Sequence, residues 1–221
     1  MARTVVNLTF HGIGEPARGL DDGEAAVWLE RSRFLSVLDS VAGRNDVRIT
    51  FDDGNASDLE HALPALRERG LTAAFFVVAG RVGTPGFVDA AGIRALDSAG
   101  MAVGCHGLRH RPWRSLDSRT LERDLLDARA TLESIVARPV VQAACPFGSY
   151  DRRVLRVLRR CGFRTVYTSD AGTARPRAWI QARNTVGARD TVPRLDELLS
   201  SRRSPSRTVR RQAQRVVKRW R

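Results

Sequence analysis

Residues 47–54, VRITFDDG, join a short apolar run to two consecutive aspartates and a glycine. The first five residues, 47–51, have the β-branched and aromatic composition of a buried strand. Asp52 and Asp53 therefore fall where this strand is expected to end, and Gly54 marks the turn that follows it. The stretch predicts a strand that delivers two carboxylates to one edge of a sheet.

The alternation of apolar runs with helical stretches continues on both sides of this segment. Such alternation, with short connections that contain glycine, predicts βαβ units and a parallel sheet. Periodicity alone leaves open a doubly wound sheet and a small, irregular (β/α) barrel, and in both folds functional residues follow the carboxyl ends of strands. The expected strands are 4–10, 47–51, 72–79, 101–106, 140–145, 163–168 and 178–186; the expected helices are 24–41, 57–69, 87–99, 117–136 with Ser118 as N-cap, and 151–161.

The positive charge of the chain is concentrated at its C-terminal end. Of the formal net charge of +13, residues 201–221 carry +9, from nine basic and no acidic residues. Residues 1–200 hold 28 basic and 24 acidic residues, so they carry only +4. We therefore expect one domain over 1–200 and a basic, Arg-rich tail over 201–221. The tail is interpreted either as a solvated segment or as a dock for an anionic membrane surface or acidic partner; nucleic acid is the lesser alternative.

Two further features bear on the compartment. No apolar run approaches the ~20 residues of a membrane span, and the first residues lack the pattern of a signal peptide. The expectation is a cytoplasmic protein, peripheral at the inner membrane surface if the tail docks there. Cys105, Cys145 and Cys161 form no C-x-x-C pair, so all three are expected to be reduced.

Residues with catalytic chemistry collect directly after the expected strands. His11 follows the first strand, Asp52 and Asp53 the second, and His106 and His110 the fourth. One aspartate and two histidines are a sufficient ligand set for a divalent metal such as Zn²⁺ that keeps an open position for water. The H-x-x-x-H spacing allows both rings to face one point. A second, non-ligating carboxylate beside that water is what a hydrolase needs as a general base.

Three motifs together resemble those of the polysaccharide deacetylases of the NodB-homology type, carbohydrate esterase family four. They are TFDDG (50–54), HGLRH (106–110) and ACPFG (144–148), and the resemblance covers about residues 4–190. It implies a distorted (β/α) barrel of about seven parallel strands, in agreement with the strand count above.

The resemblance also implies a role for each motif residue. Asp52 would be the general base, while Asp53, His106 and His110 would bind the metal, zinc or another divalent ion such as Co²⁺, Mn²⁺ or Ni²⁺. Pro146-Phe147 would line the acetate pocket, and the backbone N–H of Phe147 would help to hold the oxyanion.

The chain departs from the family pattern in three places. Ala144 stands where the family often has an arginine, and the segment YTSDAG keeps Asp170 but has no tryptophan. IQARNTV (180–186) lacks the late histidine that serves as general acid. His11 is a candidate replacement if the first two strands are neighbours; the alternative is a structural histidine that bonds the backbone of the Gly12–Gly14 turn.

The implied function is a metal-dependent hydrolase that removes N-acetyl groups from an amino sugar or a polysaccharide precursor. Two alternatives stay open. One is a non-catalytic sugar-binding or scaffold module on a degenerate deacetylase fold, and the other is an amidase that acts on a small non-sugar amide. The sequence gives no indication of the oligomeric state.

Overall fold

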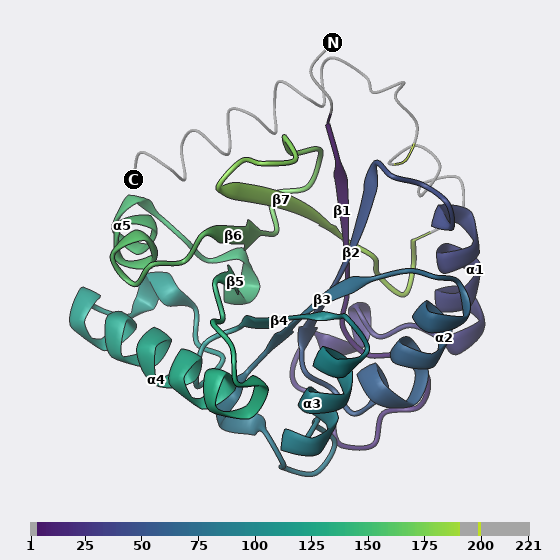
Figure 1. The fold of residues 1–221 in the computed structure, drawn as a ribbon, viewed down its shortest axis with the longest axis horizontal. Coiled ribbons are helices and arrows are strands. Elements are labelled where there is room, and N and C mark those ends of the chain that lie inside the picture. The colour runs from purple at the N-terminus through teal and green to yellow at the C-terminus, as the bar shows by residue number, and fades with distance from the viewer. Residues whose placement is uncertain (1–3, 191–198, 200–221) are drawn as a thin grey trace.

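A computed structural model describes residues 4–190 and residue 199. Its seven strands are all parallel and close a barrel in chain order, from β1 to β7 and back to β1 (Figure 1). The expected distorted (β/α) barrel is confirmed. The strands are β1 (Val6–Phe10), β2 (Val47–Asp53), β3 (Ala73–Val77), β4 (Ala102–Cys105), β5 (Gln142–Ala144), β6 (Thr165–Thr168) and β7 (Ile180–Thr185); the helices are α1 (Arg31–Val41), α2 (Leu63–Glu68), α3 (Ala90–Ser98), α4 (Ser118–Val136) and α5 (Arg152–Arg160).

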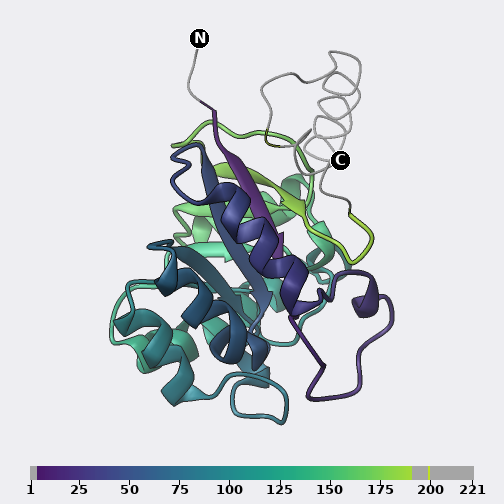
Figure 2. The same cartoon turned by 90° about the vertical axis from the view of Figure 1, so that its right-hand side faces the viewer.

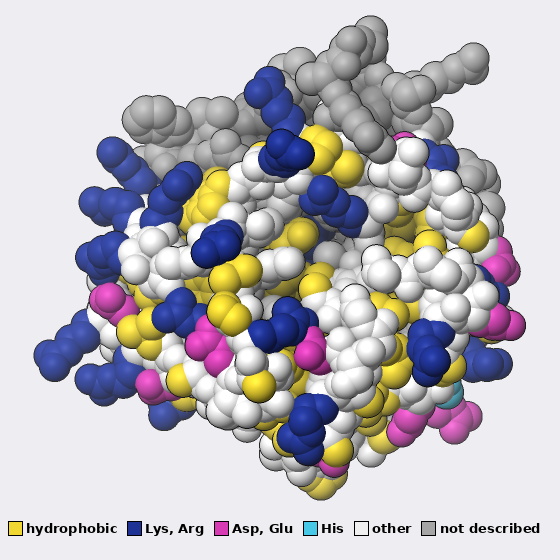
Figure 3. Space-filling view, in the orientation of Figure 1, with side chains coloured by type: hydrophobic (Ala, Val, Ile, Leu, Met, Phe, Trp, Pro, Cys, Tyr) yellow, Lys and Arg dark blue, Asp and Glu magenta, His cyan; other side chains and the backbone are white. Residues whose placement is uncertain are grey.

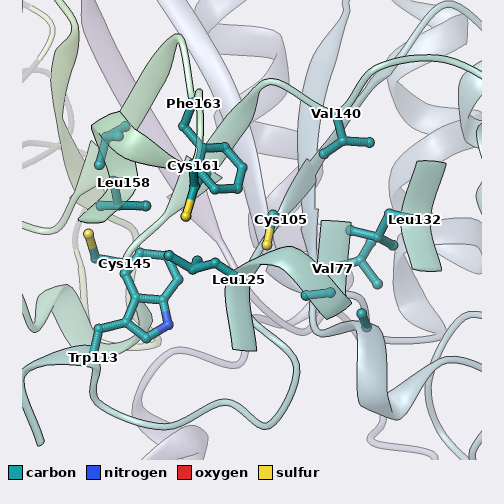
Figure 4. Packing of buried hydrophobic residues seen from close by; sticks show 14 of the residues in the cluster. Val77, Cys105, Trp113, Leu125, Leu132, Val140, Cys145, Leu158, Cys161 and Phe163 are labelled. Atoms are coloured by element: carbon teal, nitrogen blue, oxygen red, sulfur yellow. The ribbon is translucent and has the colours of Figure 1, made fainter. Parts of the chain in front are cut away.

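The helices cover the outside of the barrel and enclose two main apolar clusters. Figure 2 shows α1 lying across β1 and β2, and the cluster there includes stacked Phe51 and Phe75, with ring centroids 4.6 Å apart. The second cluster lies beneath α4 and α5, around fully buried Trp113 and Leu125 (Figure 4). Burial of these faces against the sheet, at about 25 cal/mol per Å² of apolar surface, holds the helices in place.

The expected helix over 24–41 is shorter than predicted. A 3₁₀ turn, η1 (Glu24–Ala26), comes first, and α1 begins only at Arg31. The backbone between them is extended because the N–H of Leu29 donates to Gly12 and its carbonyl accepts from Gly14. Trp28 also packs so closely over Gly12 that a Cβ there would clash with the indole ring. Pairing with a distant loop therefore overrides the local helical pattern.

Two smaller expectations also differ from the structure. The segment expected as a helix over 57–69 begins as a π-helix, η2 (Asp58–Ala62), before α2. The N-cap of α4 is Asp117 rather than Ser118, because the Asp117 carboxylate accepts from the first backbone N–H groups of the helix. Aspartate and serine are comparable N-caps, so the sequence did not separate them.

Two of the expectations from the sequence, on membrane spans and on the cysteines, concern the described residues. None of the helices over 4–190 has the length and apolar character needed to cross a bilayer. Cys105, Cys145 and Cys161 are buried, and none of them is part of a disulfide. The basic tail, 201–221, lies outside the described residues, and its role stays a prediction.

Candidate active site

The strand register brings the predicted site residues to one end of the barrel. β1 and β2 are paired up to Phe10 and Phe51, so His11 and Asp52 follow at neighbouring positions. The end of β2 is paired with β3, where Asp53 lies opposite Val77, and β3 is paired with β4, which ends one residue before His106. Side chains that lie about fifty residues apart in the sequence therefore share one end of the barrel, as carboxyl ends of parallel strands do.

Asp53, His106 and His110 converge on one point. The Nε2 atoms of His110 and His106 lie 3.1 Å and 3.5 Å from Oδ1 of Asp53. One potential ligand atom from each residue lies within 4.8 Å of those of the other two. Asp53 and His106 are buried and His110 is partly exposed, so the cluster opens toward solvent on the side of His110.

The environment of this cluster suits a divalent cation. Nδ1 of His106 lies 2.9 Å from the carbonyl oxygen of Ala144. A proton on Nδ1 donates to that oxygen and leaves the lone pair of Nε2 facing Asp53, as in metal-ligating histidines. Oδ1 of Asp53 is buried, and the imidazole nitrogens Nε2 of His110 and His106 face it without the alignment of a regular hydrogen bond. A cation bound between these atoms would neutralise the buried carboxylate and use the lone pairs of both imidazoles.

The protonation states of the cluster match those of metal ligands. Burial opposes ionisation of Asp53, but the imidazole of His110 in contact with it, together with His11 and His106, holds the pKa of this carboxyl well below its ordinary value. Burial lowers the pKa of His106 to about 4. At neutral pH the aspartate is ionised and His106 is neutral, so both carry free lone pairs without losing a proton first.

Three site residues adopt a backbone conformation that side chains rarely take. Asp53, His110 and Phe147 have φ angles of 76°, 50° and 55°. They are three of the five non-glycine residues with positive φ in the described chain. Each such residue costs on the order of 1–3 kcal/mol, and such strain concentrates at functional sites. The rest of the fold therefore holds these three residues against their local preference.

Pro146 and Phe147 lie in the 3₁₀ turn η5 (Pro146–Gly148), directly after β5. Pro146 is buried, whereas Phe147 is 66% exposed and its ring centroid lies 4.6 Å from that of His110. No described residue accepts a hydrogen bond from the backbone N–H of Phe147. An exposed aromatic ring beside the candidate metal ligands and an unused N–H donor fit the pocket wall and the oxyanion donor predicted for this turn.

Comparisons with known proteins agree with this geometry. The family model described as "Polysaccharide deacetylase" matches residues 39–166, more than half of the chain. The chain belongs to the polysaccharide deacetylase family. A chitooligosaccharide deacetylase from Rhizobium leguminosarum bv. trifolii is 30% identical over 156 residues, which cover 68% of each protein.

Two more proteins show how much of this chain is similar to known proteins. The protein YxkH of Bacillus subtilis (strain 168) is 20% identical over 154 residues; these cover 70% of this chain but only 55% of YxkH. The crystal structure of BC0361, a polysaccharide deacetylase from Bacillus cereus, superimposes with a TM-score of 0.78 at 18% identity. It covers 90% of this chain and 70% of BC0361. At that identity the superposition supports the fold.

One prominent residue of the candidate site was not identified from the sequence. Arg183 of β7 donates two hydrogen bonds of 2.6 Å, one to each carboxylate oxygen of Asp52. The side chain of Arg183 is 0% exposed and that of Asp52 is 4% exposed. Burial opposes ionisation of Asp52, but Arg183 holds its pKa below the ordinary value. Asp52 is therefore a fixed, ionised carboxylate at neutral pH.

The position of Arg183 follows from closure of the barrel. β7 pairs with β1, where Arg183 lies opposite Asn7, and β1 pairs with β2, which carries Asp52. Ala144, where the family pattern often has an arginine, offers no side-chain charge to Asp52, and its backbone carbonyl lies 2.9 Å from Nδ1 of His106. IQARNTV contains no histidine but does contain Arg183, its only charged residue, and a single charge within an expected strand was the available signal.

His11 lies near the two aspartates but makes no structural hydrogen bond in the described residues. Its Nδ1 is buried without a partner, and the imidazole contributes to the lowered pKa of both Asp52 and Asp53. The expected pairing of the first two strands is confirmed. No hydrogen bond joins the His11 ring to the Gly12–Gly14 turn, so the structural alternative lacks its proposed contact; the role as acid stays a prediction.

Proposed function

We propose that this deacetylase-family protein is a metal-dependent hydrolase that removes N-acetyl groups from an amino sugar or a polysaccharide precursor. The observation that carries the proposal is the convergence of Asp53, His106 and His110 beside a separate, ionised carboxylate, Asp52. Oδ2 of Asp52 lies 3.8 Å from Nε2 of His106, so the carboxylate adjoins the cluster without belonging to it. A ligand set plus a non-ligating carboxylate is the equipment for hydrolysis by an activated water.

Asp53, His106 and His110 would hold one divalent ion. Zinc suits imidazole and carboxylate ligands best, and Co²⁺, Mn²⁺ and Ni²⁺ are alternatives. The bound ion supplies Lewis acidity and lowers the pKa of a water molecule beside it.

The residues of the chain perform the proton transfers and the charge stabilisation. Asp52 accepts a proton from the attacking water, and Arg183 keeps its carboxylate in a single orientation. The backbone N–H of Phe147 donates to the oxyanion that develops on the acetamide carbonyl, an interaction typically worth about 3–4 kcal/mol of barrier. Asp52 can return its proton to the leaving amine, or His11 can supply one.

The metal is tested by ligand removal. We expect stoichiometric divalent metal in the purified protein, and loss of both metal and acetate release in His106→Ala and in a His106→Ala/His110→Ala variant. His61→Ala is the matched control, because His61 lies in η2 outside the cluster. Full metal content in the double variant would refute the assignment.

The base is tested separately from the metal. Asp52→Asn should keep the metal while turnover falls by roughly 10²–10⁴-fold, the range for loss of general-base catalysis. The assay is acetate release from N-acetylated oligosaccharides, with metal content and circular dichroism measured on the same sample. Near-normal turnover would show that another group removes the proton. Absence of acetate release from every N-acetylated sugar, with full metal content, would favour a sugar-binding module or an amidase.

A further inference from the structure

Helix α5 differs in charge from every other described helix. Its nine residues, RRVLRVLRR, contain five arginines and no acidic residue. By contrast, α4 has three arginines and four acidic residues, and α3 has one of each. The arginine-rich composition of the chain therefore does not by itself explain α5, because other helices balance their arginines with acids. The apolar residues Val154, Val157 and Leu158 are buried, which leaves the arginines on the outer face.

These arginines line a groove on the surface. The groove has a volume of about 620 Å³ and is lined by α5 together with Ser118, Trp179 and Ile180. Figure 3 shows Lys and Arg side chains gathered along the left edge of the molecule, over the region of α5 and the adjoining part of α4. A concave, cationic surface is better suited to bind an extended anionic ligand than a flat cationic surface is.

Two of the groove arginines are available to a ligand. Arg156 and Arg159 are exposed, and neither forms an ion pair with a carboxylate in the described chain. The guanidinium of Arg159 lies over the Trp179 ring, 4.0 Å from its centroid, and the indole N–H is itself fixed to the carbonyl of Phe163. Stacking on a fixed ring pre-orients the guanidinium, so less entropy is lost when it binds a carboxylate or phosphate.

The groove begins at the same end of the barrel as the candidate active site. Asp151, the N-cap of α5, follows Phe147 by four residues. Arg153 of the groove donates to the backbone carbonyls of Trp113 and Arg114, in the turn that follows His110. From there α5 runs about 13 Å, at 1.5 Å per residue, toward the start of β6 at the opposite end. A chain bound along α5 therefore passes from the site rim down the flank of the barrel.

We infer that the α5 groove binds an N-acetylated glycan that carries anionic groups, carboxylate or phosphate, while one of its sugars occupies the active site. This inference rests on the proposed function for its substrate, and it adds the anionic class and the docking surface. Arginine is the residue that matches both anions through paired N–H donors. The groove starts at Arg152, five residues after Phe147, and this nearness to the rim of the site favours a glycan over a membrane surface or a nucleic acid.

The experiment measures binding independently of catalysis. Hyaluronan hexasaccharide, which alternates N-acetylglucosamine with a carboxylate sugar, is titrated against the full chain with neutral chitohexaose as reference. We expect tighter binding of hyaluronan that weakens with salt. Arg156→Gln/Arg159→Gln should weaken it by at least about tenfold, the effect of losing one charged hydrogen bond. The matched control, Arg67→Gln/Arg94→Gln, removes two exposed charges from α2 and α3 and should leave it unchanged.

Four outcomes would overturn the inference. They are no binding of hyaluronan, equal binding of chitohexaose, equal weakening in both double variants, and α5-dependent binding confined to phosphatidylglycerol vesicles or single-stranded DNA. Acetate release from chitohexaose by the unaltered protein, measured in parallel, reports on the proposed function alone. Groove-dependent binding without acetate release would refute the proposed activity and leave the anionic docking surface intact.

Discussion

The buried pair of Arg183 and Asp52 gives the sharpest test of how this site is built. Arg183→Met keeps a straight side chain of similar length and removes the charge. Asp52 then remains a carboxylate with both oxygens deprived of their 2.6 Å donors and almost no access to water. Breaking a buried pair by removing one partner costs about 3–5 kcal/mol. For a chain of this size this corresponds to a fall in melting temperature of roughly 6–20 °C.

The pair also predicts a specific pattern in a double-mutant cycle. Asp52→Asn leaves the Arg183 guanidinium buried without its carboxylate, so it should also destabilise the protein. The double variant Asp52→Asn/Arg183→Met removes both charges, and its loss of stability should be well below the sum of the two single losses. Arg160→Met is the control, since the Arg160–Glu122 pair is largely exposed and should cost under about 1 kcal/mol.

The assay is thermal and urea unfolding of the four proteins at pH 7. Additive losses across the cycle would show that the two residues do not act as a pair. A melting temperature for Arg183→Met within about 2 °C of the parent would refute the calculated cost, because that shift corresponds to no more than about 1 kcal/mol.

Two further predictions concern groups around the aspartates. If His11 is the catalytic acid, His11→Ala should lower turnover by roughly 10²–10⁴-fold, remove the alkaline limb of the pH–rate profile and barely change the melting temperature; a lower melting temperature with an unchanged profile would contradict that role. Asp58 is buried without a hydrogen-bond donor to either oxygen, and burial, with Asp53 and Asp52 nearby, raises its pKa well above the ordinary value. Its stabilising effect is therefore full below pH ~4 and is lost as the pH rises toward its folded pKa. Asp58→Asn should stabilise the metal-free protein at pH 8 and have little effect near pH 4, as measured by urea unfolding; an equal effect at both values would contradict the raised pKa.

The parallel strands and the candidate metal ligands were readable in the sequence because their signals are local, whereas the choice of a barrel over a doubly wound sheet came from the resemblance to the family. The pattern of apolar residues that marks a buried strand can be recognised within five or six residues. Parallel strands then place the residues that follow them at one end of the sheet. This is why the spacing of Asp52, Asp53, His106 and His110 pointed to one site, and why seven expected strands match seven in the structure.

The boundaries of the helices were less well determined by the sequence. The pattern over 24–41 is helical, but the extended stretch at Trp28 and Leu29 is fixed by the loop at Gly12 and Gly14, which no local pattern reveals. Tertiary contacts of this kind outweigh helix propensities of less than 1 kcal/mol per residue.

Only the tertiary structure assigned a partner to Asp52. Arg183 and Asp52 are 131 residues apart, and they meet because β7 closes the barrel against β1. A sequence determines which residues can ionise, form hydrogen bonds or bind a metal. Which buried charge faces which other depends on strand order and register, because desolvated ion pairs act over only a few ångströms.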